Sequence, residues 1–240
     1  MSALLPEFKY GQRMSEKQAE FVRRQPPVES AAAAGIIYSL LATIAFLSID
    51  KIPAPSSSEL EWTEWIEDGG NRAMLILFLN LASVSAVAFL WFVAVIRRRV
   101  GDREDRFFAT VFLGSALVYV SLWLVAASII ASPAVLSSLD DGRPLNWEVY
   151  RLAEGTAAAI LLVAIPRISA VFVASTSTVY LRTGVVPNWL AYVGYTVAFG
   201  LFFVPFVTTP LGLGLPLFVL ISSVTILVTR ARSHEGDPLE

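Results

Sequence analysis

The stretch TAAAILLVAIPRISAVFVASTSTVYL, residues Thr156 to Leu181, decides the fold class of this chain. It is an apolar run that can cross the hydrocarbon core of a bilayer as one helix, which takes about 20 residues. Pro166 and Arg167 lie near the middle of the run. An arginine at that depth is costly unless nearby groups accommodate it, so Arg167 is the first candidate for a functional residue.

Five more apolar runs surround this one. The chain has 240 residues, of which 55% are hydrophobic and only 16% are charged, and its mean hydropathy is +0.64. Because the charges gather between the apolar runs, the sequence predicts an all-α, polytopic membrane protein with six transmembrane helices. A polar N-terminal tail (1–30) and C-terminal tail (230–240) flank a helical domain at 31–229. The expected spans are about 31–49, 73–96, 107–130, 156–181, 188–206 and 211–229.

The distribution of lysine and arginine predicts the orientation of the spans. The two tails and the loops after the second and fourth spans together carry thirteen basic residues, whereas the opposite loops carry four. Loops rich in lysine and arginine stay in the cytoplasm. We therefore expect a multi-pass protein of a bacterial cytoplasmic (plasma) membrane with both termini inside.

The first loop expected outside contains SSSELEWTEWIEDGG, which predicts a short helix capped by Ser57 or Ser58 and closed by Gly69. Trp62 and Trp65 fall on one face of that helix, and carboxylates fall on another. A helix of this kind suits the membrane interface. The alternative is that its acidic face gathers cations or docks a partner.

The second outer loop offers a pair of adjacent acids, Asp140 and Asp141. Paired carboxylates can perform acid–base chemistry or bind a metal, but acids beside glycine and proline are typical of a simple turn. Asn146 then predicts the start of a helix that can run directly into the fourth span.

The residues that are missing exclude several kinds of chemistry. The chain has no cysteine, and its single histidine, His234, lies in the polar tail. Disulfides, thiolate nucleophiles, iron–sulfur ligation and a bis-histidine haem are therefore excluded. No lysine lies within a span, so a retinal-type Schiff base has no candidate. We expect no cofactor, no metal site, no catalytic residue and no nucleic-acid surface.

The C-terminal half resembles a known group of proteins. The sequence STSTVYLRTGVVPNWLAYVGY, followed by PLFVLISSVTIL, is similar to a recurring half of uncharacterised six-span integral membrane proteins of actinobacteria, families of unknown function. The resemblance covers roughly residues 165–230 and rests on short turns, small residues and interface aromatics such as Trp189. It implies a six-helix bundle and a high-GC Gram-positive source, and it implies no activity.

Arg167 and its surroundings form the candidate site. Pro166 has no N–H for the carbonyl of Leu162, so an acceptor is left open beside a predicted kink. No span carries a carboxylate at the depth of Arg167, which leaves carbonyls, hydroxyls such as Ser169, the amide of Asn80, water or an external anion as partners. Two interpretations stay open: a site for an anion, or an arginine that stabilises the kink.

These observations favour a non-enzymatic accessory or scaffold component that acts through protein partners or lipids. The alternative is a small transporter or channel-like protein that uses Arg167 to bind an anionic or amphiphilic solute. A membrane-embedded enzyme is the weakest alternative, because titratable groups are scarce in the spans. The expected partners are membrane lipids, another membrane protein or a second copy of the chain.

Overall fold

The computed structural model describes residues 28–54, 56–100, 106–139, 147–184, 186–204 and 212–235, and these residues form helices and loops without a strand. The all-α class is therefore confirmed. Residues 1–27 of the predicted tail at 1–30, the turn at Asp140 and Asp141, and Asn146 lie outside the described residues. The helices are α2 (Val28–Ile49), α3 (Glu59–Glu67), α4 (Gly69–Val100), α5 (Arg106–Leu139), α6 (Trp147–Ala159), the π-helical turn η2 (Ile160–Ala164), α7 (Ile165–Thr183), α8 (Asn188–Phe203) and α10 (Gly214–Glu235).

Four of the described helices are long and apolar enough to cross a membrane: Ser30–Ile49, Gly69–Arg97, Thr110–Leu139 and Trp147–Thr183. The last is continuous through α6, η2 and α7, so the helix that begins after Asn146 does run into the predicted fourth span. Two shorter apolar helices, Asn188–Phe203 and Gly214–Thr229, match the predicted fifth and sixth spans.

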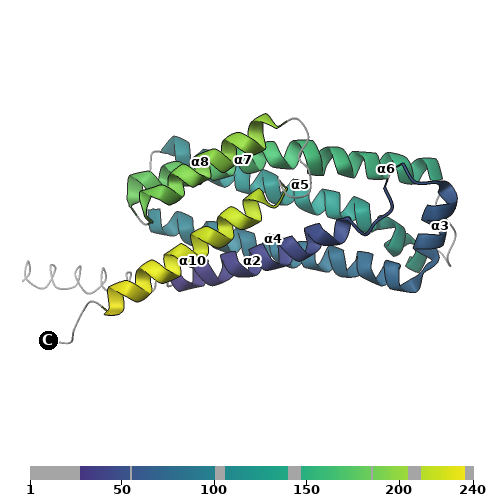
Figure 1. The fold of residues 1–240 in the computed structure, drawn as a ribbon, viewed down its shortest axis with the longest axis horizontal. Helices are drawn as coiled ribbons and strands as arrows, with labels where there is room; N and C mark the ends of the chain where they lie inside the picture. The colour runs from purple at the N-terminus through teal and green to yellow at the C-terminus, as the bar shows by residue number, and fades with distance from the viewer. Residues whose placement is uncertain are drawn as a thin grey trace, which may run out of the picture.

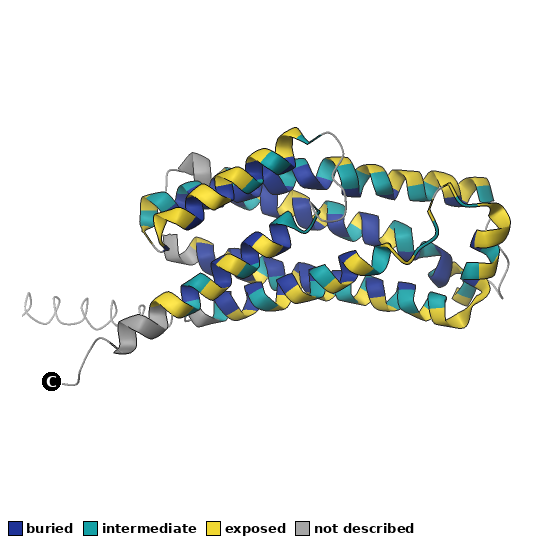
Figure 2. Cartoon of the chain, in the orientation of Figure 1, coloured by how far each residue is buried: buried dark blue, intermediate teal, exposed yellow. Residues whose placement is uncertain are grey.

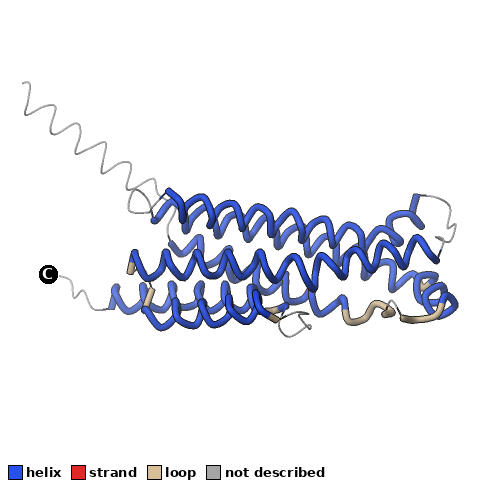
Figure 3. The backbone as a smooth tube through the Cα atoms, turned by 90° about the horizontal axis from the view of Figure 1, so that it is seen from above, coloured by secondary structure: helices blue, strands red, loops and turns tan. Residues whose placement is uncertain are grey.

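The helices pack as an elongated bundle (Figure 1, Figure 3). Each is in contact with two neighbours in the order α8, α7, α5, α4, α2 and α10, and smaller contacts of α10 with α7 and α8 close the ring. The helix α3 lies across one end of the bundle, beside α6 (Figure 1). The predicted third span extends further than expected, because α5 continues through Pro133 to Leu139.

The contacts of α2 with α10 fix the level at which α10 begins. A Cβ atom on Gly35 would collide with Oγ of Ser223, and a Cβ atom on Gly212 would collide with the ring of Phe46. Gly35 and Phe46 are eleven residues apart, as are Gly212 and Ser223, so the two helices are antiparallel and in register. The start of α10 therefore lies about one helical turn from Ile49, where α2 ends.

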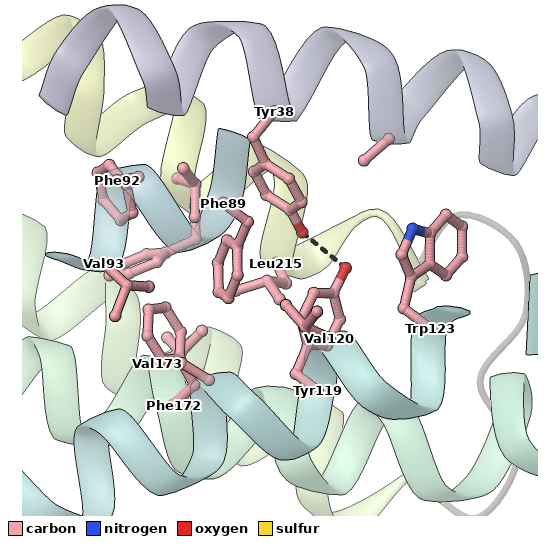
Figure 4. Packing of buried hydrophobic residues seen from close by; sticks show 14 of the residues in the cluster. Tyr38, Phe89, Phe92, Val93, Tyr119, Val120, Trp123, Phe172, Val173 and Leu215 are labelled. Atoms are coloured by element: carbon pink, nitrogen blue, oxygen red, sulfur yellow. Dashed lines mark hydrogen bonds between the residues drawn. The ribbon is translucent and has the colours of Figure 1, made fainter. Parts of the chain in front are cut away.

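Aromatic side chains fill the centre of the bundle (Figure 4). Phe89 of α4 contacts Tyr38, Tyr119 and Phe172, with ring centroids 4.7, 5.0 and 5.0 Å away. The hydroxyls of Tyr38 and Tyr119 share a hydrogen bond of 2.7 Å, so the polar tip of each ring is satisfied inside the core. Four helices are thus joined by one aromatic cluster.

Exposed residues lie along the outer faces of the helices (Figure 2), and many of them are large and apolar. The helices α2, α4, α5, α8 and α10 each expose several of them, including Leu40, Val87, Leu117 and Phe199, whereas α7 exposes none. In water this arrangement would leave a large apolar area unburied. An apolar exterior around a packed interior agrees with a membrane protein.

The short helix α3 confirms one predicted cap and corrects one predicted end. Oγ of Ser58 accepts a hydrogen bond from the backbone N–H of Glu61, as expected for an N-cap. The prediction that Gly69 closes this helix is wrong, because Gly69 is the first residue of α4. Asp68 has an extended backbone and its carboxylate accepts from Gly70 N–H, so the chain turns at Asp68.

Candidate functional site

The π-helical turn η2 lies directly before Pro166 and Arg167 and changes the backbone hydrogen bonds beside them. Its last backbone bond runs from Ile165 N–H to the carbonyl of Ile160, five residues back. Pro166 follows and supplies no N–H, so the carbonyl of Leu162 lacks its α-helical donor, as the sequence predicts. The π turn therefore lies where the helix has to rearrange its hydrogen bonds around a proline.

The guanidinium of Arg167 supplies the donors that the helix lacks. Its Nη1 donates to the carbonyl of Leu162 at 3.4 Å and to that of Val163 at 3.0 Å. Its Nη2 donates to the carbonyl of Val204 at 3.2 Å. Val204 is the C-cap residue of α8, where carbonyls lack helical partners and the helix dipole favours a cation. Arg167 thus joins the bend in one helix to the end of another.

Arg167 lies about midway along the continuous helix Trp147–Thr183. Its neighbours in the chain, Ile165 and Ser169, line one small cavity together with Phe46 and Gly212. These are the residues that mark the start of α10, one turn from the end of α2. Arg167 is therefore level with the last turns of α2 and α8, and its side chain reaches the carbonyl at the end of α8.

The structure separates the other two residues of the predicted site. Asn80 is exposed, and its side-chain amide donates to the carbonyl of Ile76 on its own helix at 2.8 Å. Ser169 is buried and lines the small cavity with Tyr119 and Trp123. That cavity has about 10 Å³, which is room for a single water at most. A ligand-binding role for Arg167, Asn80 and Ser169 together stays a prediction.

The three tryptophans predicted at the interface differ in exposure. Trp62 is only 2% exposed and stacks on Tyr150, with ring centroids 4.0 Å apart, so it packs α3 against α6. Trp65 is half-buried, whereas Trp189 at the start of α8 is exposed. Contact with the membrane interface stays a prediction for all three, and Trp189 is the one whose ring is open to it.

A cavity that sequence reasoning missed lies beside the end of α2; we call it the outer cavity, after the topology proposed below. It has a volume of about 320 Å³, in the usual range for small-molecule sites. The turn after α2, the helix α5 and the α6–η2 helix form its walls. Its polar residues are Asp50, Tyr150 and Glu154, and its remaining lining is alanine, isoleucine and leucine. Tyr150 and Glu154 are four residues apart on one helical face, a signal that the sequence does contain.

A shallow groove runs along the outside of α2 and α4. It has a volume of about 360 Å³, and small residues such as Ala33, Ala34 and Ala88 line it beside Val87 and Trp91. Small residues let a second helix approach closely. Among the described residues, no group of three or more acids or histidines is placed to hold a metal ion.

No protein-family model, no curated protein and no solved structure matches this chain. The resemblance of residues 165–230 to six-span actinobacterial membrane proteins therefore stays a prediction.

Proposed function

We propose that this chain is a six-span protein of a bacterial cytoplasmic membrane with both termini in the cytoplasm. The register of α2 and α10 supports six spans, because it places Gly212, two residues before α10, about one turn from the level at which α2 ends. The excess of lysine and arginine at the other end supports the orientation. In this arrangement α3, α6 and the outer cavity lie on the outer side of the membrane.

Within this topology we propose a non-enzymatic accessory or scaffold role, carried out through protein partners or lipids. The observation that carries the proposal is the state of Arg167, whose guanidinium is bound by three backbone carbonyls. A residue that joins α7 to α8 through backbone carbonyls has a structural role, because it stabilises the packing of the two helices. The tight aromatic core between α2, α4, α5 and α7 supports the same conclusion, since a transport path needs a hydrated opening.

The groove between α2 and α4 is the surface on which a scaffold role would depend. A photoreactive amino acid at Val87, which is exposed and lines the groove, tests it in living cells. Leu117 is an exposed apolar position on α5 and serves as the matched control. We expect a discrete crosslinked protein or a retained lipid at position 87 and neither at position 117. Equal labelling at the two positions would contradict the proposal.

A flux assay separates this role from the transporter alternative. The purified protein in liposomes should give no saturable uptake of organic anions beyond that of empty liposomes. Saturable uptake that is lost in Arg167→Ala and kept in Arg167→Lys would establish transport through Arg167 and overturn the scaffold proposal.

A further inference from the structure

The lining of the outer cavity is negative and otherwise apolar. Two of its residues, Asp50 and Glu154, are acids, and none of the described residues that line it is a lysine, arginine or histidine. Most of the wall consists of aliphatic side chains from α2, α5 and the α6–η2 helix. A cavity of this composition complements a molecule that has a positive head and an apolar body.

Buried polar atoms beside the cavity indicate which kind of positively charged head group a ligand should have. Nε1 of Trp62, the hydroxyl of Tyr150 and Oε2 of Glu154 are buried and make no hydrogen bond with the residues that the structure describes. Tyr150 is only 6% exposed and lines the cavity. Its hydroxyl is near both the Trp62 indole and the Glu154 carboxyl, outside hydrogen-bond geometry.

The hydrogen-bonding capacities of these three groups leave the Glu154 carboxylate as an acceptor without a donor. Trp62 can only donate, Tyr150 can donate and accept, and an ionised Glu154 can only accept. None of the three is hydrogen-bonded to another, so Oε2 of the Glu154 carboxylate keeps its lone pairs for a ligand. A complementary head group must bring N–H donors as well as positive charge.

The aromatic rings beside the cavity argue against a quaternary ammonium. Such a group is usually held against open ring faces. Tyr150 is the one aromatic residue among the described residues that line the cavity, and its ring is itself packed against Trp62 at 4.0 Å and Trp147 at 5.5 Å. The hydroxyl of Tyr150 is buried and has no hydrogen bond with the described residues, so a ligand that supplies an N–H donor can satisfy it.

We propose that the outer cavity binds an amphiphilic primary ammonium, with its N–H groups on Glu154 and Tyr150 and its alkyl part against the aliphatic wall. The same chemistry is offered by a free long-chain amine and by the ethanolamine head group of a phospholipid. The cavity lies level with Ile49 and Asp50, at the end of an apolar helix, where an amphiphile can enter from the bilayer.

Binding is measured by calorimetry on the full chain in phosphatidylcholine nanodiscs, with empty nanodiscs as the blank for partitioning. Octylammonium is the probe, and octyltrimethylammonium and octanoate are the comparison ligands. We expect saturable binding of one octylammonium per chain, at least tenfold tighter than either comparison ligand. Octyltrimethylammonium binding as tightly as octylammonium would overturn the proposal, and so would the absence of saturable binding together with no retained ethanolamine lipid.

Three variants locate the site. Glu154→Gln keeps the shape and removes the charge, so it should weaken octylammonium binding at least tenfold. Tyr150→Phe keeps the ring stack and should weaken it severalfold. Glu64→Gln removes an exposed acid of α3 that does not line the cavity and should leave it unchanged. If Glu154→Gln does not fold, Tyr150→Phe and Asp50→Asn test the site instead. Octylammonium binding that is unchanged in both variants would overturn the assignment of the site to this cavity.

Native mass spectrometry of the protein from mixed ethanolamine and choline lipids distinguishes the two sources. Preferential retention of one ethanolamine lipid, lost in Glu154→Gln, assigns the site to a lipid head group. Saturable octylammonium binding without a lipid preference assigns it to a free amine.

Discussion

Nη2 of Arg167 lies 3.2 Å from the carbonyl oxygen of Val204, the residue at which α8 ends. This contact joins two helices whose backbones both have unpaired carbonyls at the same level. One carbonyl is freed by Pro166, and the other belongs to a helix terminus. The guanidinium therefore donates to carbonyls that a proline and a helix end leave without a backbone donor.

Replacing Arg167 should cost stability. Arg167→Ala leaves the carbonyls of Leu162 and Val204 without this donor, which we expect to cost about 2 kcal/mol, or about 4–8 °C in the midpoint of thermal unfolding. Arg167→Lys keeps one charged donor and should lose less. The measurement is thermal unfolding in detergent, with Arg151→Ala, an exposed arginine of α6, as the control. If Arg167→Ala melts together with the wild type, the capping role is excluded.

For the hydrogen-bonded tyrosine pair of the core, we expect the double substitution to cost less stability than the sum of the two single substitutions. Tyr119→Phe leaves the hydroxyl of Tyr38 buried without its partner and should destabilise the protein by about 1–3 kcal/mol. Adding Tyr38→Phe removes the stranded hydroxyl and should recover most of that loss. A double-mutant cycle from unfolding midpoints measures the coupling. Losses that simply add would show that the hydrogen bond between the two rings contributes no coupling.

Hydrophobic patterning predicted most of the helices, because long apolar runs admit few other structures. It did not predict where a helix outlasts its apolar run, as α5 does beyond Pro133. It also predicted that Gly69 ends the helix α3. In the structure the turn between α3 and α4 depends on Asp68, whose carboxylate accepts from Gly70 N–H at the start of α4. Glycine marks such a turn without showing which of its two neighbouring helices it belongs to.

The sequence could not predict the contact of Arg167 with the end of α8, or the outer cavity, because both depend on how helices distant in the chain pack together. The apolar run from Thr156 to Leu181 does not show that α8 stops beside its first half. The cavity brings Asp50 to the same space as Tyr150 and Glu154, which are about one hundred residues later in the chain. Only the Tyr150–Glu154 spacing was visible beforehand, as a pair on one helical face.

The close approach of α2 and α10 should make Gly35 intolerant of a side chain. A Cβ atom there would meet Ser223 and Phe92, so Gly35→Leu should overpack the contact and cost about 1–3 kcal/mol. Gly114 of α5 has no atom within 4 Å of such a Cβ, so Gly114→Leu is the matched control and should be nearly neutral. Unfolding midpoints in detergent report both. Equal effects of the two substitutions would argue against the register of α2 and α10.

The position of the connection between α8 and α10 tests the six-span account most directly. The chain has no cysteine, so single cysteines can be introduced at Leu213 and, for comparison, at Glu64 and Ser233. Labelling intact cells with a membrane-impermeant maleimide should modify positions 64 and 213 and should spare 233 until the cells are permeabilised. If position 213 is protected in intact cells and reacts only from the cytoplasmic side, α8 and α10 form a re-entrant hairpin, and the six-span account is contradicted.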